Sequence, residues 1–217
     1  MNFVLEQSAI FPPYRAGALA GVSGYRIGQW ARYGLIRPTL FHGRPANRYA
    51  FNDVAEAIVV HWLLDKGFGY PAIHSAIDAA RKAFPAWPLQ SSSLGIAQHA
   101  VRGDPRGAIV QEVEPGVYVE TGRPGDQITL RPELLDGVRQ MLRRGGWLAD
   151  DLGLDRLEVD PTRLGGAPTV LGRRWPVERV AQLADDEGGR RILVDDYGLD
   201  TRDVEQSCRW VKAATEL

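Results

Sequence analysis

The sequence Gly21-Val22-Ser23 separates two short segments that are predicted to be helical, and this feature restricts the fold of the chain most strongly. A glycine permits the tight turn that brings a second helix back across the first, and a serine is a favoured residue at a helix N-terminus. Residues 15–20 and 24–33 are therefore predicted to form the two helices of a helix-turn-helix, with Gly34 ending the second helix.

The predicted second helix has two chemically different faces at 3.6 residues per turn. The face expected to be buried holds Ile27, Trp30 and Ala31. The opposite face holds Tyr25, Gln29 and Arg32, with Arg26 at its edge. Arginine and glutamine form paired hydrogen bonds with base edges in the major groove, and tyrosine reaches phosphates, so this face suits a recognition helix. Gly28 would let the helix approach DNA closely.

The charges of the chain are unevenly distributed. No acidic residue occurs between Glu6 and Asp53, a stretch that contains six arginines. A solvated surface normally mixes both signs, so this stretch favours a polyanionic partner. Residues 1–82 carry nine basic and five acidic side chains, whereas residues 150–217 carry ten basic and fifteen acidic ones. The two ends of the chain are therefore expected to bind different partners.

A hairpin is predicted directly after the helix-turn-helix. Residues 40–41 and 48–51 are typical of short strands, and the Gly/Pro/Asn-containing turn at 42–47 lies between them. A basic hairpin in this place is a wing that contacts the DNA backbone or the minor groove. The predicted DNA-binding residues are Ser23, Tyr25, Arg26, Gln29, Arg32, Arg37, His42, Arg44, Asn47 and Arg48.

Residues 14–84 resemble the winged helix-turn-helix of MerR-like regulators. The resemblance rests on Leu19-Ala20-Gly21-Val22-Ser23, Ile27-x-x-Trp30-x-Arg32-Tyr33-Gly34-Leu35-Ile36-Arg37-Pro38 and Arg48-Tyr49-x-Phe51-x-Asp53. It implies binding to double-stranded DNA. MerR-like regulators usually continue into a long coiled-coil helix, whereas Pro85, Pro88 and the serines at 91–93 interrupt this chain at the corresponding place.

The middle of the chain carries no recognisable chemistry. Residues 85–105 are predicted to be a linker or an ordered loop, and residues 108–113, 117–120 and 127–130 to be short strands. A helix with its buried side at 134–142 follows, ending at Gly145-Gly146. We interpret this part as a scaffold, with an edge strand that pairs with a partner as the alternative.

The C-terminal part is predicted to contain a strand at 157–161 and helices at about 176–184, 190–197 and 201–214. Residues 157–214 resemble a small antitoxin-like domain of bacterial toxin–antitoxin operons. The resemblance rests on Gly-Gly-x-Pro-x-x-x-Gly-x-Arg-x-Pro-Val from Gly165 to Val177 and on Asp196-Tyr197-Gly198-Leu199. Together the two modules look like a VapB-type antitoxin. This implies a PIN-domain ribonuclease toxin with a magnesium-binding acidic active site as partner, and repression of the antitoxin's own operon.

Arginine pairs bidentately with carboxylates, so Arg173 and Arg174, beside Trp175, are the predicted toxin-binding residues. The alternative is that Trp175 belongs to the core and that the two arginines are only solvated. The acidic excess of the C-terminal part could complement a basic RNA-binding rim on the toxin, or it could serve solvation alone.

We therefore expect a mostly α (α+β) protein with a DNA-binding domain at 1–84, a linker with short strands and a helix at 85–150, and a small helical, helix-turn-helix-like domain at 151–217. The leading function is an antitoxin that binds operator DNA as a homodimer, with the helix at 54–64 or the middle strands as interface. The alternatives are a stand-alone MerR-like regulator with a C-terminal domain that senses a small molecule or a protein, and an adaptor that does not bind DNA.

No catalytic residue, cofactor or metal site is predicted. The four histidines are scattered without the spacing of metal ligands, and the single cysteine, Cys208, has no nearby histidine. We expect a protein of the cytoplasm without a membrane partner, because the longest apolar run, at residues 57–64, is too short to span a bilayer.

Overall fold

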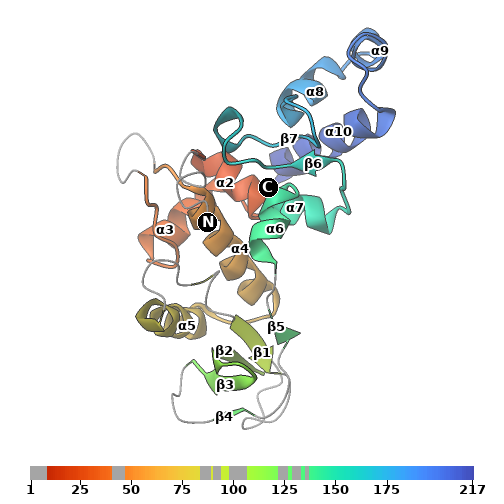
Figure 1. The fold of residues 1–217 in the computed structure, drawn as a ribbon. Coiled ribbons are helices and arrows are strands. Elements are labelled where there is room, and N and C mark those ends of the chain that lie inside the picture. The colour runs from red at the N-terminus through yellow and green to blue at the C-terminus, as the bar shows by residue number, and fades with distance from the viewer. Residues whose placement is uncertain are drawn as a thin grey trace. The chain divides into compact units, whose positions relative to one another are not determined.

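The computed structural model describes residues 9–40, 47–83, 89, 94–97, 107–121, 127–128, 133–134 and 137–217. The fold is mixed α+β and mainly helical (Figure 1), which confirms the predicted class. Contacts divide the chain into a first unit, Met1–Ile58 with Arg139–Leu217, and a second unit, Val59–Val138. The predicted boundaries at 84 and 150 stay a prediction.

The first unit contains both ends of the chain. Its elements are α2 (Pro13–Leu19), α3 (Gly24–Arg32), the start of α4 (Phe51–Asp65), α6 (Val138–Arg143), α7 (Gly146–Asp151), β6 (Leu157–Glu158), the 3-10 turn η1 (Leu164–Gly166), β7 (Thr169–Val170), α8 (Val177–Leu183), α9 (Glu187–Asp195) and α10 (Thr201–Glu216). Within the described residues, no helix is both long and apolar enough to cross a membrane.

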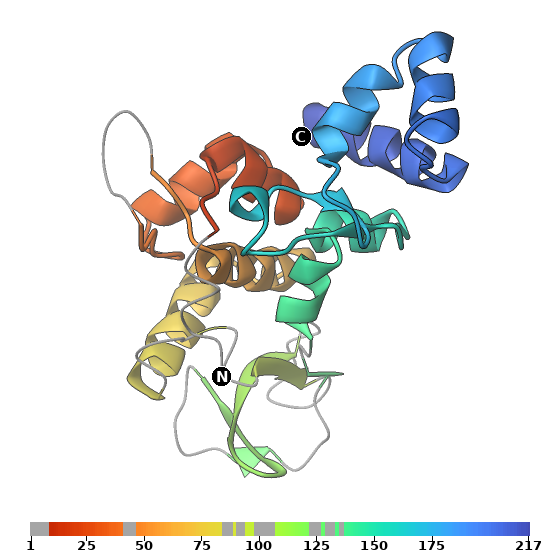
Figure 2. The ribbon, with the colours of Figure 1, turned by 45° about the horizontal axis from the view of Figure 1, so that its top comes forward.

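The predicted helix-turn-helix forms as α2 and α3, which lie against each other (Figure 2). Gly21 has a φ of 73°, as the predicted tight turn requires, and the Ser23 hydroxyl caps α3 by accepting from the Arg26 backbone N–H at 3.3 Å. The two helices meet so closely that a Cβ at Gly17 would lie 2.4 Å from the carbonyl oxygen of Val22. Glycine at position 17 is therefore required for this helix crossing.

A pairing that the sequence did not predict forms after α3: Tyr49 pairs with Phe11, through backbone hydrogen bonds of 2.9 and 3.0 Å. Leu40 lies in a bend, and the predicted hairpin stays a prediction because its turn lies outside the described residues. The pairing is decided by the burial of Ala9 and Phe11, which the local sequence around residue 49 does not reveal. Residues 41–46, which include the predicted DNA contacts His42 and Arg44, lie outside the described residues.

Helix α4 begins at Phe51, three residues before the predicted start. The buried Asp53 carboxylate accepts hydrogen bonds from the Ala50 N–H at 2.7 Å, the Thr39 N–H at 2.9 Å and the Thr39 hydroxyl at 3.0 Å. The first of these satisfies a backbone donor at the helix N-terminus, and the other two fasten the loop after α3. The helix segment considered as a dimer interface is mostly buried within the chain itself.

The second unit is built around an antiparallel sheet. Its elements are the end of α4, α5 (Tyr70–Ala83), β1 (Leu94–Ala97), β2 (Ala108–Glu114), β3 (Val117–Glu120), β4 (Gln127–Ile128) and β5 (Glu133–Leu134). The strand order is β4-β3-β2-β1-β5. The predicted linker contains β1, and β5 pairs with it at Gly95 and Ile96, so the following helix begins only at Val138.

The C-terminal part of the first unit contains a helix that the sequence did not predict. Gly145 and Gly146 have φ values of 108° and 82°, so they end α6, but α7 starts at once. A Cβ at Gly146 would lie 2.3 Å from the Leu19 carbonyl oxygen, because α7 packs against α2. Further along, Gly165 and Gly166 form a turn with φ values of 63° and 78°, and a Cβ at Gly166 would lie 2.7 Å from the ring of Phe11.

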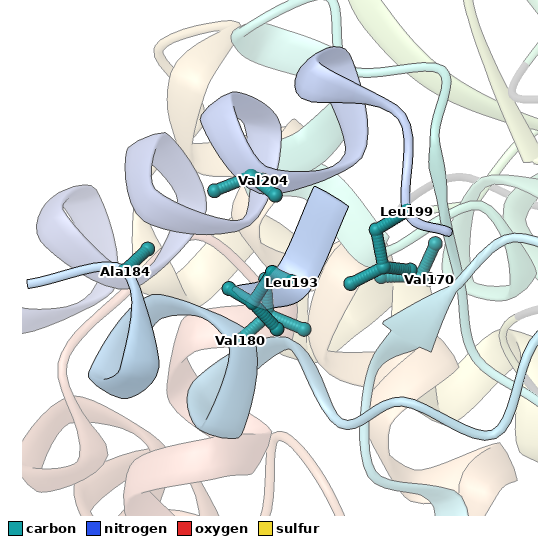
Figure 3. Close-up of a cluster of buried hydrophobic side chains, with 6 residues drawn as sticks. All are labelled: Val170, Val180, Ala184, Leu193, Leu199 and Val204. Carbon is teal, nitrogen blue, oxygen red and sulfur yellow. The ribbon is translucent and has the colours of Figure 1, made fainter. Parts of the chain in front are cut away.

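The three last helices share a small core. Figure 3 shows the side chains of Val180 from α8, Leu193 from α9 and Val204 from α10 gathered together with Val170 of β7. Ala184 and Leu199, which follow α8 and α9, complete this set of buried residues. Their burial fixes the α8–α9 pair on α10.

Candidate nucleic-acid interface

Burial along α3 follows the predicted division of its faces. The side chains of Ile27 and Trp30 are fully buried. Tyr25 is 71% exposed, Arg26 and Arg32 are exposed, and Gln29 is half-buried. The helix therefore presents a polar, aromatic and cationic face to solvent, with Tyr25, Gln29 and Arg32 on one line along it.

Gly28 lies on the exposed side of α3. A Cβ placed there would have no atom within 4 Å among the described residues, and its backbone is not in the left-handed region. Neither packing nor backbone geometry therefore requires a glycine, although glycine in a helix interior costs about 0.5–1 kcal/mol relative to alanine. Close approach of an external partner is a physical reason for retaining it.

The exposed arginines of this region keep their charges available. In the part of the chain that the structure describes, no ion pair holds the guanidinium groups of Arg26, Arg32 or Arg37. The acidic residue that ends the acid-free stretch, Asp53, is 2% exposed and turned toward backbone donors. No carboxylate in the described residues 9–40 reduces the positive potential of this face.

The other predicted contacts are less exposed. The Ser23 hydroxyl is used as the helix cap, the Asn47 amide donates to the Tyr49 hydroxyl at 3.4 Å, and Arg48 donates to the Asn47 carbonyl at 3.3 Å. Burial raises the pKa of the Tyr49 phenol, which therefore stays neutral. Asn47 and Arg48 are positioned by the chain itself, next to the residues that the structure does not describe.

The structure adds aromatic residues that the sequence analysis did not single out. Tyr33, directly after α3, is 62% exposed, and Tyr14 at the start of α2 is 59% exposed. The spacing of eight residues between Tyr25 and Tyr33 could have placed both on one helix face.

Arg15 belongs to a different part of the surface. Its guanidinium pairs with the Glu178 carboxylate of α8 at 3.1 Å and lies 5.6 Å from the centre of the Tyr14 ring. The Arg15 side chain is only 16% exposed. One of the six arginines of the acid-free stretch therefore links α2 to α8 and is not available to a polyanion.

The three predicted toxin-binding residues have three different environments. Arg173 donates to the carbonyls of Tyr197 at 3.4 Å and Gly198 at 2.7 Å, so it neutralises the C-terminal end of α9. Trp175 is half-buried against the small core and meets the Tyr197 ring edge-on at 4.8 Å. Arg174 is exposed, and no ion pair of the described residues holds it. This geometry favours the alternative of a core role for Trp175.

A groove of about 680 Å³ opens beside α6. It is lined by Arg139, Gln140, Arg143, Arg144, Leu157, Glu158 and Leu171. The Arg139 guanidinium donates to the Asn52 amide oxygen at 3.0 Å, and Arg143 lies over the Phe51 ring at 5.8 Å. Its basic side chains come from α6 and from Arg144 directly after it, and Leu157, Glu158 and Leu171 come from β6 and from the position that follows β7.

The described residues hold no group of three or more His, Cys, Asp and Glu side chains arranged to bind a metal. Burial raises the pKa of the Cys208 thiol, which disfavours the thiolate that a nucleophile needs. The prediction that the chain is not an enzyme stays a prediction.

Comparison with known proteins gives matches to proteins of unassigned function. Residues 157–210 match a family described as "Protein of unknown function (DUF433)". A protein of Mycobacterium tuberculosis (strain ATCC 25618 / H37Rv) described as "Uncharacterized protein Rv2308" is 31% identical over 62 residues, which are 29% of this chain and 26% of that protein. The chain therefore spans about a quarter of the length of this relative.

The fold as a whole is similar to a solved structure. The X-ray crystal structure of Rv2018 from Mycobacterium tuberculosis matches with a TM-score of 0.56, covering 91% of this chain and 96% of that chain. The two sequences are 18% identical, so the likeness concerns the fold alone. The C-terminal segment thus matches a family, and nearly the whole chain shares the fold of one crystallised protein.

Proposed function

We propose that this chain is a VapB-type antitoxin that binds operator DNA through a MerR-like helix-turn-helix, represses its own operon and neutralises a PIN-domain ribonuclease. The observation that carries the DNA-binding half is the exposed face of α3, where Arg26 and Arg32 have no ion pair among the described residues and Gly28 has no packing role. In this function α3 lies in the major groove, and Arg37 and Arg48 contact phosphates beside it.

DNA binding is tested by a gel-shift titration with the promoter fragment upstream of the gene. Each phosphate contact lowers the slope of log K against log salt by about 0.9, so a protein using four arginines gives a slope of roughly −4. A homodimer protects two half-sites about 34–36 Å apart. Replacing Arg26, Gln29 and Arg32 together abolishes operator preference. If the triple variant binds the operator as tightly as the unchanged chain, the DNA site lies elsewhere.

The antitoxin half is supported by the resemblance of residues 157–214 to antitoxin-like domains and by the acidic excess of residues 150–217. Its test is co-expression of this chain with the small PIN-domain protein encoded beside it. We expect that protein to arrest growth alone and to be harmless together with this chain. A neighbouring gene without a PIN domain, or toxicity that persists with this chain present, overturns the antitoxin proposal.

The competing proposal is a stand-alone MerR-like regulator that senses a ligand. The groove beside α6, with Arg139, Arg143 and Arg144 among its lining residues, is the observation that favours it, because arginines bind carboxylates and phosphates. A ligand of such a regulator would change the affinity for operator DNA, and substitutions in the groove would weaken binding of that ligand. In the antitoxin proposal, only the ribonuclease changes operator affinity.

A further inference from the structure

The chain contains its helix-turn-helix twice. Residues 13–35 and 177–199 align without a gap, and eight of these 23 positions are identical. The identical pairs are Arg15/Arg179, Leu19/Leu183, Ala20/Ala184, Gly24/Gly188, Arg26/Arg190, Tyr33/Tyr197, Gly34/Gly198 and Leu35/Leu199. The match includes the end of the first helix and the Tyr-Gly-Leu sequence that follows the second one.

The two segments share the lengths and ends of their helices but not the turn between them, because Gly21 is in the left-handed region and its counterpart Asp185 is not. Helices α2 and α8 both have seven residues, and α3 and α9 both have nine. The alanines that end α2 and α8 have φ of −88° and −80° and ψ of 2° and 5°. The glycines after α3 and α9 have φ of 72° and 62°, and the next leucine is buried in both cases. Helix α9 therefore follows α8 as α3 follows α2, but it buries a different side: Leu193, which aligns with Gln29, is buried, and Arg191, which aligns with the buried Ile27, is exposed.

The exposed surface of α9 and its flanking residues carries more acidic than basic side chains, in contrast to that of α3, although it includes the exposed Arg191. The segment of α3 contains no acidic residue, whereas α9 is preceded by Asp185 and Asp186 and ends at Asp195 and Asp196, all four exposed. Arg190 of α9 donates to the Ala184 carbonyl at 2.8 Å, so that arginine is held against α8. A surface of this charge repels a DNA phosphate backbone.

Apolar side chains stand at the centre of this acidic surface. Leu193 points into the core in Figure 3, and its neighbour Ile192, on the outer side of α9, is 47% exposed. Asp195 and Asp196 follow Ile192 at helical spacings of three and four, so they border it. Tyr197 is 51% exposed and is braced by the Trp175 ring. A rigid apolar centre with a charged rim is the composition of a protein-docking surface.

We propose that this outer face of α9, formed by Ile192, Asp195, Asp196 and Tyr197, docks on the basic RNA-binding surface of the ribonuclease partner. The inference rests on the proposed antitoxin function. Three exposed positions of this face, Ile192, Asp196 and Tyr197, align with Gly28, Arg32 and Tyr33 at α3. Gly28 and Arg32 belong to the side of α3 that is proposed to meet a polyanion, so a copy with an aspartate in place of Arg32 fits a surface that itself binds a polyanion. The docked α9 then covers the surface on which the ribonuclease binds RNA. Arg173 acts indirectly, by holding the carbonyls beneath Tyr197.

The test measures binding of the full chain to the PIN-domain protein encoded beside it, by surface plasmon resonance at several salt concentrations. The charge-reversed variant carries Asp195→Arg and Asp196→Arg, which preserve folding because basic residues are favoured at a helix C-terminus. A second variant carries Ile192→Ala. The matched control carries Glu205→Arg and Glu216→Arg, the same charge change on exposed positions of α10.

We expect both α9 variants to bind the PIN-domain protein at least about tenfold more weakly than the unchanged chain. The charge-reversed variant also loses the salt dependence of the association rate, whereas the control keeps both properties. Operator binding stays unchanged in all three. If the unchanged chain and the α9 variants bind the PIN-domain protein equally, the docking inference is overturned and the antitoxin function stands. If the unchanged chain does not bind that protein at all, both are overturned.

Discussion

Gly28 provides the sharpest test of the role of α3, because a single methyl group should move folding stability and DNA affinity in opposite directions. The Cβ of Gly28→Ala would have no described atom within 4 Å, and the backbone at this position is not left-handed. Alanine therefore gains the usual preference of about 0.5–1 kcal/mol over glycine in a helix interior. For a chain of this length, that gain raises the melting temperature by about 1–4 °C.

In the proposed operator complex, the same methyl group would stand where α3 faces the floor of the DNA groove. Crowding of a closely packed contact by a methylene-sized group costs about 1–3 kcal/mol. An operator complex would therefore be weakened roughly fivefold to more than a hundredfold. The experiment pairs thermal unfolding, followed by circular dichroism, with fluorescence anisotropy titrations of a labelled operator duplex.

Gly17→Ala is the matched control for Gly28→Ala. It changes the same residue type in the adjacent helix, but its Cβ would lie 2.4 Å from the Val22 carbonyl oxygen, so it lowers the melting temperature. A stabilised Gly28→Ala variant with undiminished operator affinity would refute the argument that position 28 lies against DNA. A destabilised one would show that the open space on α3 is filled within the protein.

Three further predictions concern individual side chains. Arg32→Ala or Gln29→Ala is expected to reduce the free energy of operator binding by about 1–3 kcal/mol at one base step, so binding to a library of operator variants should lose its preference at that step and no other. A uniform loss of affinity across the library would instead show that the side chain contacts a phosphate. Asp53→Ala should lower the free energy of unfolding by about 2–4 kcal/mol in urea titrations, because it leaves the N–H groups of Thr39 and Ala50 without their carboxylate acceptor. The control, Asp65→Ala at the exposed end of α4, should change the free energy of unfolding little. Equal effects of the two substitutions would contradict the capping role of Asp53. Arg173→Ala should lower the free energy of unfolding by about 1 kcal/mol, because it removes two hydrogen bonds to carbonyls after α9, and Arg174→Ala should lower it almost not at all. If Arg174→Ala weakens ribonuclease binding more than Arg173→Ala does, at unchanged stability, Arg174 contacts the ribonuclease directly.

The sequence by itself determined the first helix-turn-helix and the division of the faces of α3. These features depend on local rules: a glycine in the turn, a serine cap and an apolar spacing of three and four residues. The glycines at residues 165–166 follow the same kind of local rule, because positive φ values favour glycine wherever they occur.

Only the tertiary structure decided the pairings between distant segments. Tyr49 pairs with Phe11, and β5 pairs with β1, which falls inside a stretch predicted to be a linker. The partner of a strand is chosen by which apolar residues are buried together, and a single short strand does not encode that choice.

The tertiary structure also decided which charged side chains are available to partners. The sequence contains six arginines in its acid-free stretch and two beside Trp175. The sequence alone does not distinguish which of them are exposed and which are held by other residues. In the fold, Arg15 is held by Glu178 and Arg173 by the carbonyls that follow α9, while Arg26 and Arg32 are exposed. An arginine binds the nearest acceptor that its side chain reaches, and those acceptors come from residues more than twenty positions away in the chain.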